Sequence, residues 1–282
     1  MTEARAHRPG PLAFVLLAVL AFLFILVPYL FWRQTWVGRP LTDPELTRYL
    51  EAPPHDRRTQ HALVQLSERM VAHDPSVRAW YPGLIRAAGN PDPAVRNLAA
   101  WTMGQDPASS VLHDGLRALL KDPDVQVRRN AALSLVRFGD AAGRSELVAM
   151  LRPLEIRAEK RGALRLLVRP GQTVGAGTRV ATLKEDSGAE QHETAPLHGN
   201  VAAVFAPDGA RLETGAPLMS LTPREDDVWE ALRALYFVGE TADLEDVEHY
   251  TSPVAQMPER IARQARLTTA AIRNRLAPNS SR

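Results

Sequence analysis

A long uncharged apolar run near the N-terminus, Leu12 to Trp32, dominates the hydrophobic pattern of the chain. Its twenty-one residues, at 1.5 Å each in a helix, match the roughly 30 Å core of a bilayer. Tyr29, Trp32 and Trp36 lie where an interfacial aromatic belt is expected. A cleaved signal peptide is the alternative, but its apolar segment is shorter and ends at a small-residue cleavage site. We therefore predict an N-terminal tail over 1–11 and a retained transmembrane helix over 12–32.

Further along, apolar residues recur at helical spacing in pairs of segments, a short one followed by a longer one. The short helices are predicted over 46–50, 77–87 and 112–120. The longer helices repeat at an offset of 32 residues: Val95, Arg96, Ala99 and Ala100 match Val127, Arg128, Ala131 and Ala132. A fainter copy passes through Asp56, Arg58, Ala62 and Leu66. An Asp before each longer helix is placed to cap it and to complement its dipole.

These residues resemble the HEAT repeat family, close to its bacterial HEAT-like type. The shared motif is D-x-x-V-R-x-x-A-A-x-x-L, which here runs from Asp124 to Leu135. The resemblance implies a helical solenoid over 41–155 whose surfaces bind other proteins. Metal-binding members of the family carry His-Glu dyads. In the helical segments the one neighbouring pair, Glu248-His249, has the reverse order and no second copy, so the resemblance implies no metal site.

From about residue 156 to residue 222 the pattern changes to strand-like runs separated by glycine turns. This segment is internally duplicated, with Gly162, Pro170, Gly171, Gly177 and Leu183 matching Gly199, Pro207, Gly209, Gly215 and Leu221. Each half is predicted to be strand, tight turn, strand, turn, strand, with glycines supplying positive φ at the turns. Neither half can bury its apolar face alone, so we expect the two halves to close on each other.

The duplicated pattern resembles the biotinyl/lipoyl-type barrel, including the version in membrane-fusion adaptors of bacterial efflux and secretion systems. The matching motif is G-x-V-x-x-[VF]-x-x-x-G…G-x-x-L, present twice. A carrier domain of this family needs a lysine on the hairpin that joins the halves, which falls at 187–189 here. This stretch has no lysine, and Lys184 lies at the end of the preceding strand. The resemblance therefore implies a barrel without a covalent biotin or lipoyl group.

The helical pattern resumes after the barrel, since Val228 to Gly239 aligns with Arg128 to Gly139 at an offset of 100. The segment 145–151 reads as the first helix of a repeat whose second helix follows the barrel. We predict that the barrel, 156–222, is inserted within one repeat, with its two termini close together. The resumed repeats cover 224–277 and end in a helix pair, 244–250 and 258–276, before a tail over 278–282.

The last helix is basic on one side and apolar on the other. Past Glu259 the sequence has no acid, and the helix carries Arg260, Arg263, Arg266, Arg273 and Arg275. An apolar stripe accompanies them: Ile261, Ala265, Ile272 and Leu276. A capping helix with a solvated basic face is one interpretation, and contact with anionic lipid or an acidic partner is another. Nucleic acid is not expected as a partner, because no aromatic residues interleave with the arginines.

Composition and motifs give no indication of catalysis. Cysteine is absent, which excludes thiol catalysis, disulfides and Cys-ligated metal sites, and the net charge is only +2. No phosphate loop, nucleophile elbow or dinucleotide fingerprint is present. His192 and His198 flank the hairpin of the barrel without a carboxylate that would complete a metal triad, and Asp226-Asp227 fit helix capping. We predict no catalytic, cofactor-binding or metal-binding residues and no cofactor.

The sequence thus predicts a mainly α fold: a transmembrane helix and a HEAT-like solenoid with an all-β lipoyl-like barrel-sandwich inserted in it. The predicted function is that of a non-enzymatic scaffold or accessory subunit, anchored in the inner membrane and docked on an integral membrane protein complex. An accessory or adaptor protein of an efflux or secretion transporter is the alternative, and a carrier or an enzyme is a third. The charges around the apolar run leave its orientation nearly undecided, and the resemblance to adaptors favours a periplasmic body.

Overall fold

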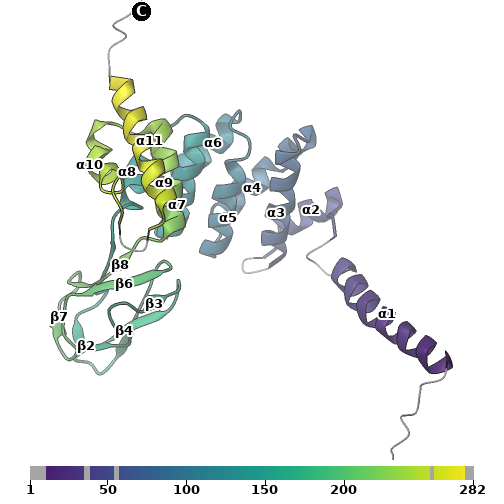
Figure 1. The fold of residues 1–282 in the computed structure, drawn as a ribbon, viewed down its shortest axis with the longest axis horizontal. Coiled ribbons are helices and arrows are strands. Elements are labelled where there is room, and N and C mark those ends of the chain that lie inside the picture. Colours follow the sequence, from purple (N-terminus) through teal and green to yellow (C-terminus); the bar gives the residue numbers. More distant parts are fainter. Residues whose placement is uncertain (1–10, 35–38, 54–56, 255–256, 277–282) are drawn as a thin grey trace, which may run out of the picture.

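The computed structural model describes residues 11–34, 39–53, 57–254 and 257–276 (Figure 1). The expectations for the tail before Pro11, for Trp36, for Asp56 and for the tail over 278–282 lie outside these residues.

Helix α1, Pro11–Gln34, contains the apolar run and stands apart from the other helices in Figure 1. Except for the half-buried Leu26, its described apolar side chains, such as Phe24 and Ile25, are exposed, and none contributes to a core. A helix must be both long and apolar enough to cross a bilayer, and a search of the described residues finds no helix that meets both requirements. The predicted transmembrane helix over 12–32 and the predicted single-pass inner-membrane location are therefore wrong.

The remaining helices form an array of helix pairs (Figure 1). The first helices of the pairs are α2 (Asp43–Leu50), η1 with α4 (Pro75–Trp80, Tyr81–Ala87), α6 (Ser110–Leu119), α8 (Arg144–Ala149) and η2 with α10 (Thr241–Asp243, Leu244–Glu248). The second helices are α3 (Arg57–Val71), α5 (Pro93–Met103), α7 (Val125–Arg137), α9 (Glu225–Val238) and α11 (Glu259–Leu276). Each first helix packs on its own second helix, and the second helices pack on one another in chain order.

The repeat motif explains how each second helix begins. The side chain of Asp92 accepts a hydrogen bond from the amide of Ala94, and that of Asp124 accepts two, from Gln126 and Val127. The predicted caps are thus confirmed at these two positions. The alanines of the motif, Ala99, Ala100, Ala131 and Ala132, are fully buried, which allows neighbouring helices to approach closely.

The arginine of the motif hydrogen-bonds to the turn before the second helix. Arg96 donates from Nε and Nη2 to the two carboxylate oxygens of Asp122, at 2.7 and 2.9 Å. Its Nη1 also donates to two backbone carbonyl oxygens of the turn, at 2.9 and 3.1 Å. One repeat later, Arg128 bonds the turn carbonyls in the same way, and its Nε donates to Glu146 at 2.9 Å. We call each of these arrangements an arginine bracket.

Buried hydroxyl groups join successive second helices at equivalent repeat positions. Each donates to a backbone carbonyl of the preceding second helix: Thr102 to Leu63 at 3.4 Å, Ser134 to Ala100 at 2.9 Å and Thr268 to Leu232 at 2.8 Å. On α9 the equivalent residue is Ala234, so α9 has no hydroxyl at this position. Arg129 lies buried at this contact, 3.8 Å from Asp227, and burial lowers the pKa of its guanidinium. The contact between α7 and α9 is therefore built differently from its neighbours.

Between α8 and α9 the chain forms eight strands: β1 (Leu154–Arg157), β2 (Gly162–Leu166), β3 (Thr173–Val174), β4 (Arg179–Lys184), β5 (Glu190–Thr194), β6 (Gly199–Val204), β7 (Arg211–Leu212) and β8 (Pro217–Thr222). They make two antiparallel sheets, with strand orders β1-β8-β6-β3 and β5-β4-β2-β7. Buried residues of both sheets form one core, which includes Leu164, Leu183, Val201 and Leu221. We call this unit the sandwich.

The two halves of the sandwich exchange strands. β3 of the first half pairs with β6 of the second, and β7 of the second half pairs with β2 of the first. The duplicated glycines have matching backbone angles, with φ of 82° and 78° at Gly171 and Gly177, and of 83° and 82° at Gly209 and Gly215. Positive φ at these turns, as predicted, is confirmed.

The predicted closed barrel is wrong, because each sheet ends in strands that have a neighbour on one side only: β1 and β3 in one sheet, β5 and β7 in the other. The predicted mainly α fold is also wrong. The protein is a mixed helix-and-sheet structure in which two open antiparallel sheets accompany the helical array.

The first and last strands of the sandwich pair side by side, with Leu154 opposite Leu221. The chain therefore leaves and re-enters the helical array at nearly the same place. There α8 packs directly on α9, although the whole sandwich separates them in the sequence. Buried residues of α8, α9, α10 and α11, together with Ala132 of α7, form a second helical core next to that of α2 to α7, and the sandwich has a core of its own.

Candidate functional site

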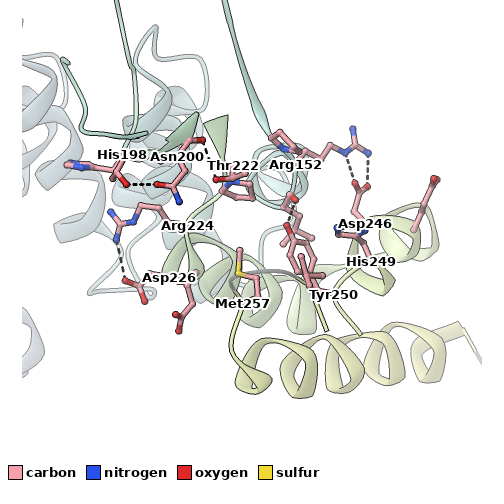
Figure 2. A pocket seen from close by; sticks show the side chains of 18 residues that line it. Arg152, His198, Asn200, Thr222, Arg224, Asp226, Asp246, His249, Tyr250 and Met257 are labelled. Atoms are coloured by element: carbon pink, nitrogen blue, oxygen red, sulfur yellow. Dashed lines mark hydrogen bonds and ion pairs between the residues drawn. The ribbon is translucent and has the colours of Figure 1, made fainter. Parts of the chain in front are cut away.

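A cleft of about 740 Å³ lies where the sandwich joins the helical array (Figure 2). Its walls come from both linkers, from the ends of β3, β6 and β8, from the start of α9, and from α10 with the segment after it. The cleft thus brings together residues from 151 to 257, and no single sequence motif marks it.

Most charged groups in the cleft bind each other. Arg152 donates from Nε and Nη2 to the two oxygens of Asp246, both at 2.6 Å. Arg224 donates to Asp226 at 3.3 Å. Figure 2 shows both pairs at the rim of the cleft, one on each side. Arg260 of α11 also pairs with Glu225 and Asp226, so three of the four acids that line the cleft have an arginine partner, while Glu245 makes no ion pair among the described residues.

The inner surface of the cleft is largely apolar. Tyr250 is buried and donates from Oη to the carbonyl oxygen of Leu151 at 2.7 Å. Burial, together with the charge of Asp246, raises the pKa of Tyr250 to about 12, so the phenol stays protonated at neutral pH. Val254 and Met257 line the same surface. This combination suits an apolar group rather than a small charged one.

The histidines near the cleft make no catalytic or metal-binding arrangement in the part of the chain described. His198 and His249 both line the cleft and are exposed, and the ring of His249 packs edge-on against Tyr250 with centroids 4.9 Å apart. His192 lies instead on β5, with its Nδ1 3.3 Å from the hydroxyl of Thr182. Among the described residues, no group of three His, Asp or Glu side chains is close enough to hold a metal ion.

The hairpin between β4 and β5 is a tight turn without a lysine. The amide of Glu185 donates to the carbonyl of Ala189 at 2.8 Å, and Gly188 has a φ of 86°. Lys184 ends β4 and is exposed, on the strand rather than at the tip of the turn.

Most arginines of α11 form ion pairs or hydrogen bonds with other residues of the chain. They pair as follows: Arg260 with Glu225 and Asp226, Arg266 with Glu259, Arg273 with Glu248, and Arg275 with the backbone carbonyls of Tyr236 and Gly239. Arg260 also lies over the ring of Trp229, at 5.2 Å from its centroid. Ile261, Ala265 and Ile272 are buried against the array. These contacts favour the interpretation of α11 as a capping helix over that of a free basic surface.

Comparison with known proteins supports the repeat assignment. A family model described as HEAT repeats matches residues 81–165, which confirms the predicted HEAT-like repeats in that segment. No curated protein matches the chain. One solved structure similar to part of the chain is that of a single-chain, multi-domain long-chain acyl-CoA carboxylase. Its identity is 21%, its TM-score is 0.24, and the match covers 35% of this chain and 9% of that one, so it supports no conclusion about fold or function.

Proposed function

We propose that the protein is a non-enzymatic scaffold, an accessory subunit that holds other proteins on its helical array and its sandwich. The observation that carries this proposal is the chemistry of the cleft, where most of the acids pair with arginines around an apolar interior. HEAT repeats supply extended surfaces for protein contact, which agrees with this role.

We infer further that the sandwich is related to the biotinyl/lipoyl type of domain, in an open two-sheet form that is not a carrier. The support is its two equivalent halves, each with the same glycine turns, and the absence of a lysine at 187–189. Intact-mass measurement of the purified chain tests the second part of this inference. We expect the unmodified mass, and an added biotinyl or lipoyl group would refute it.

Affinity purification under non-denaturing conditions tests the scaffold function. With a tag at the C-terminus, we expect at least one partner to co-purify in a constant ratio to the tagged chain. The test variant is the double substitution Tyr250→Ala/Met257→Ala, which removes apolar groups from the cleft. If a partner docks in the cleft, this variant is expected to capture less of it than the wild type does. Repeated recovery of the chain alone would contradict the proposal.

A further inference from the structure

The second helices of the array carry an exposed ridge at one repeated position. Five buried alanines, at 62, 99, 131, 231 and 265, mark the same place on α3, α5, α7, α9 and α11. Two residues after each alanine stand, in chain order, Val64, Trp101, Leu133, Arg233 and Leu267. Because the second helices pack side by side, these five side chains form a row across the array, which we call the ridge.

Four of the five ridge residues are apolar, and three of these are open to solvent. Val64 is 40% exposed, Trp101 44% and Leu267 53%, while Leu133 is partly buried. Phe237, one helical turn beyond Arg233 on α9, is 65% exposed and packs edge-on against Tyr236. Exposed apolar side chains gathered in this way are typical of a surface that binds another protein.

Positive charge accompanies the ridge. Arg137 lies one turn beyond Leu133, and Arg263 one turn before Leu267. Within the described residues, the side chains of Arg137, Arg233 and Arg263 make no hydrogen bond or ion pair of their own. Acids on the same face are fewer: Glu68 one turn beyond Val64, and Glu230 one turn before Arg233. Glu230 attracts Arg233 electrostatically, so the positive charge left over on this face comes mainly from Arg137 on α7 and Arg263 on α11, and it is complementary to an acidic partner.

We propose that the ridge binds an acidic amphipathic segment of a partner protein, with apolar residues on one side and carboxylates around them. This inference rests on the proposed scaffold function and assigns the array its partner chemistry. Successive helices are about 8–10 Å apart, so the ridge spans roughly 32–40 Å over its four steps. A helical segment of about 21–27 residues, at 1.5 Å each, covers that length.

A designed peptide tests the proposal on the full chain. The probe is a fluorescein-labelled 25-residue helix with Leu on one face and Glu elsewhere, and the control peptide has Lys in place of each Glu. By fluorescence anisotropy we expect the acidic peptide to bind and the basic one not to bind. We expect the affinity to fall about tenfold in Trp101→Glu and in the double variant Arg137→Glu/Arg233→Glu, since central interface residues contribute at this level.

Two matched variants on the first helices control for charge and hydrophobicity. Val111→Glu on α6 replaces an exposed apolar residue, and Arg78→Glu on η1 replaces an exposed arginine. Both are expected to change the affinity less than twofold. Circular dichroism of each variant checks that the array is folded, and the arginine double variant, which changes only exposed side chains, keeps the test decisive if Trp101→Glu unfolds.

The proposal is overturned if the basic peptide binds as tightly as the acidic one, or if the ridge variants bind no worse than the controls. The same ridge variants, used in the affinity purification, distinguish failure of the ridge proposal from failure of the proposed scaffold function. A partner that co-purifies equally with wild type and ridge variants leaves the scaffold function standing and refutes the ridge as its site.

Discussion

Replacing Asp122 with alanine tests whether the arginine brackets stabilise the array. The side chain of Asp122 is 5% exposed and that of Arg96 is 13% exposed, so the change leaves a nearly buried guanidinium without its carboxylate partner. Removing one partner of a buried ion pair costs about 3–5 kcal/mol of folding free energy. Arg96 keeps its two carbonyl acceptors at 2.9 and 3.1 Å, so we expect the lower end, about 3 kcal/mol.

Urea unfolding followed by far-UV circular dichroism and tryptophan fluorescence measures this loss, since Trp80 is buried in the affected core. The matched control is Glu51→Gln. Glu51 pairs with Arg86 at 3.3 Å, and both side chains are more than half exposed, so we expect a change within about 0.5 kcal/mol. Equal unfolding midpoints for Asp122→Ala and Glu51→Gln would refute the reasoning.

The same pair predicts a dependence on pH. Burial acts to raise the pKa of Asp122, but the hydrogen bonds from Arg96 and from the amide of Asp124 prevail and lower it. A carboxylate with a lowered pKa in the folded state stabilises at neutral pH, and this contribution is lost as the pH falls below about 4. The difference between wild type and Asp122→Ala should therefore shrink in acid, and a constant difference would contradict the assigned cause.

Three further predictions concern the helix contacts and the sandwich. Ser134→Ala removes the bond to the carbonyl of Ala100 and should lower the unfolding free energy by about 1 kcal/mol in the same urea titration; an unchanged midpoint would show that the hydroxyl contributes nothing. Gly162→Ala places a Cβ 2.7 Å from the carbonyl oxygen of Lys184, so we expect faster proteolysis of the sandwich. In the control Gly89→Ala the new Cβ lies 3.5 Å from its nearest neighbour, the carbonyl oxygen of Arg86, and this variant should behave as wild type. Replacing residues 154–222 with a short Gly-Ser linker should leave the helical unfolding transition in place, because β1 and β8 pair where the chain leaves the array; loss of helical signal would refute this.

The repeated parts of this protein were the predictable parts. A motif such as D-x-x-V-R-x-x-A-A records local geometry, and its Asp caps the helix as predicted and its Ala packs, whereas the bonds of its Arg to the turn were not predicted. The turn glycines of the sandwich were predictable for the same reason, since positive φ is a property of a single residue.

What depends on distant residues was not predictable. The strands β1 and β5 were missed, because each owes its place to pairing with β8 or β4 rather than to its own alternation. The sequence pattern of each half does not indicate that β3 and β7 pair with strands of the other half. The cleft is lined by linker, strand and helix residues that share no sequence pattern. The apolar run of α1 led to the prediction of a transmembrane helix, which the helix as a whole does not support.

The insertion of the sandwich sets an order of events during synthesis of the chain. The core of α2 to α7 is complete once residue 137 has left the ribosome, but α8 then waits for α9, more than 70 residues later. The first half of the sandwich waits in part as well: β2 can pair with β4 of the same half, but it gains its second neighbour only with β7, and β3 has no partner until β6 emerges. A nascent chain that has passed α8 but has not yet reached α9 therefore exposes apolar residues such as Leu147, which the complete fold buries.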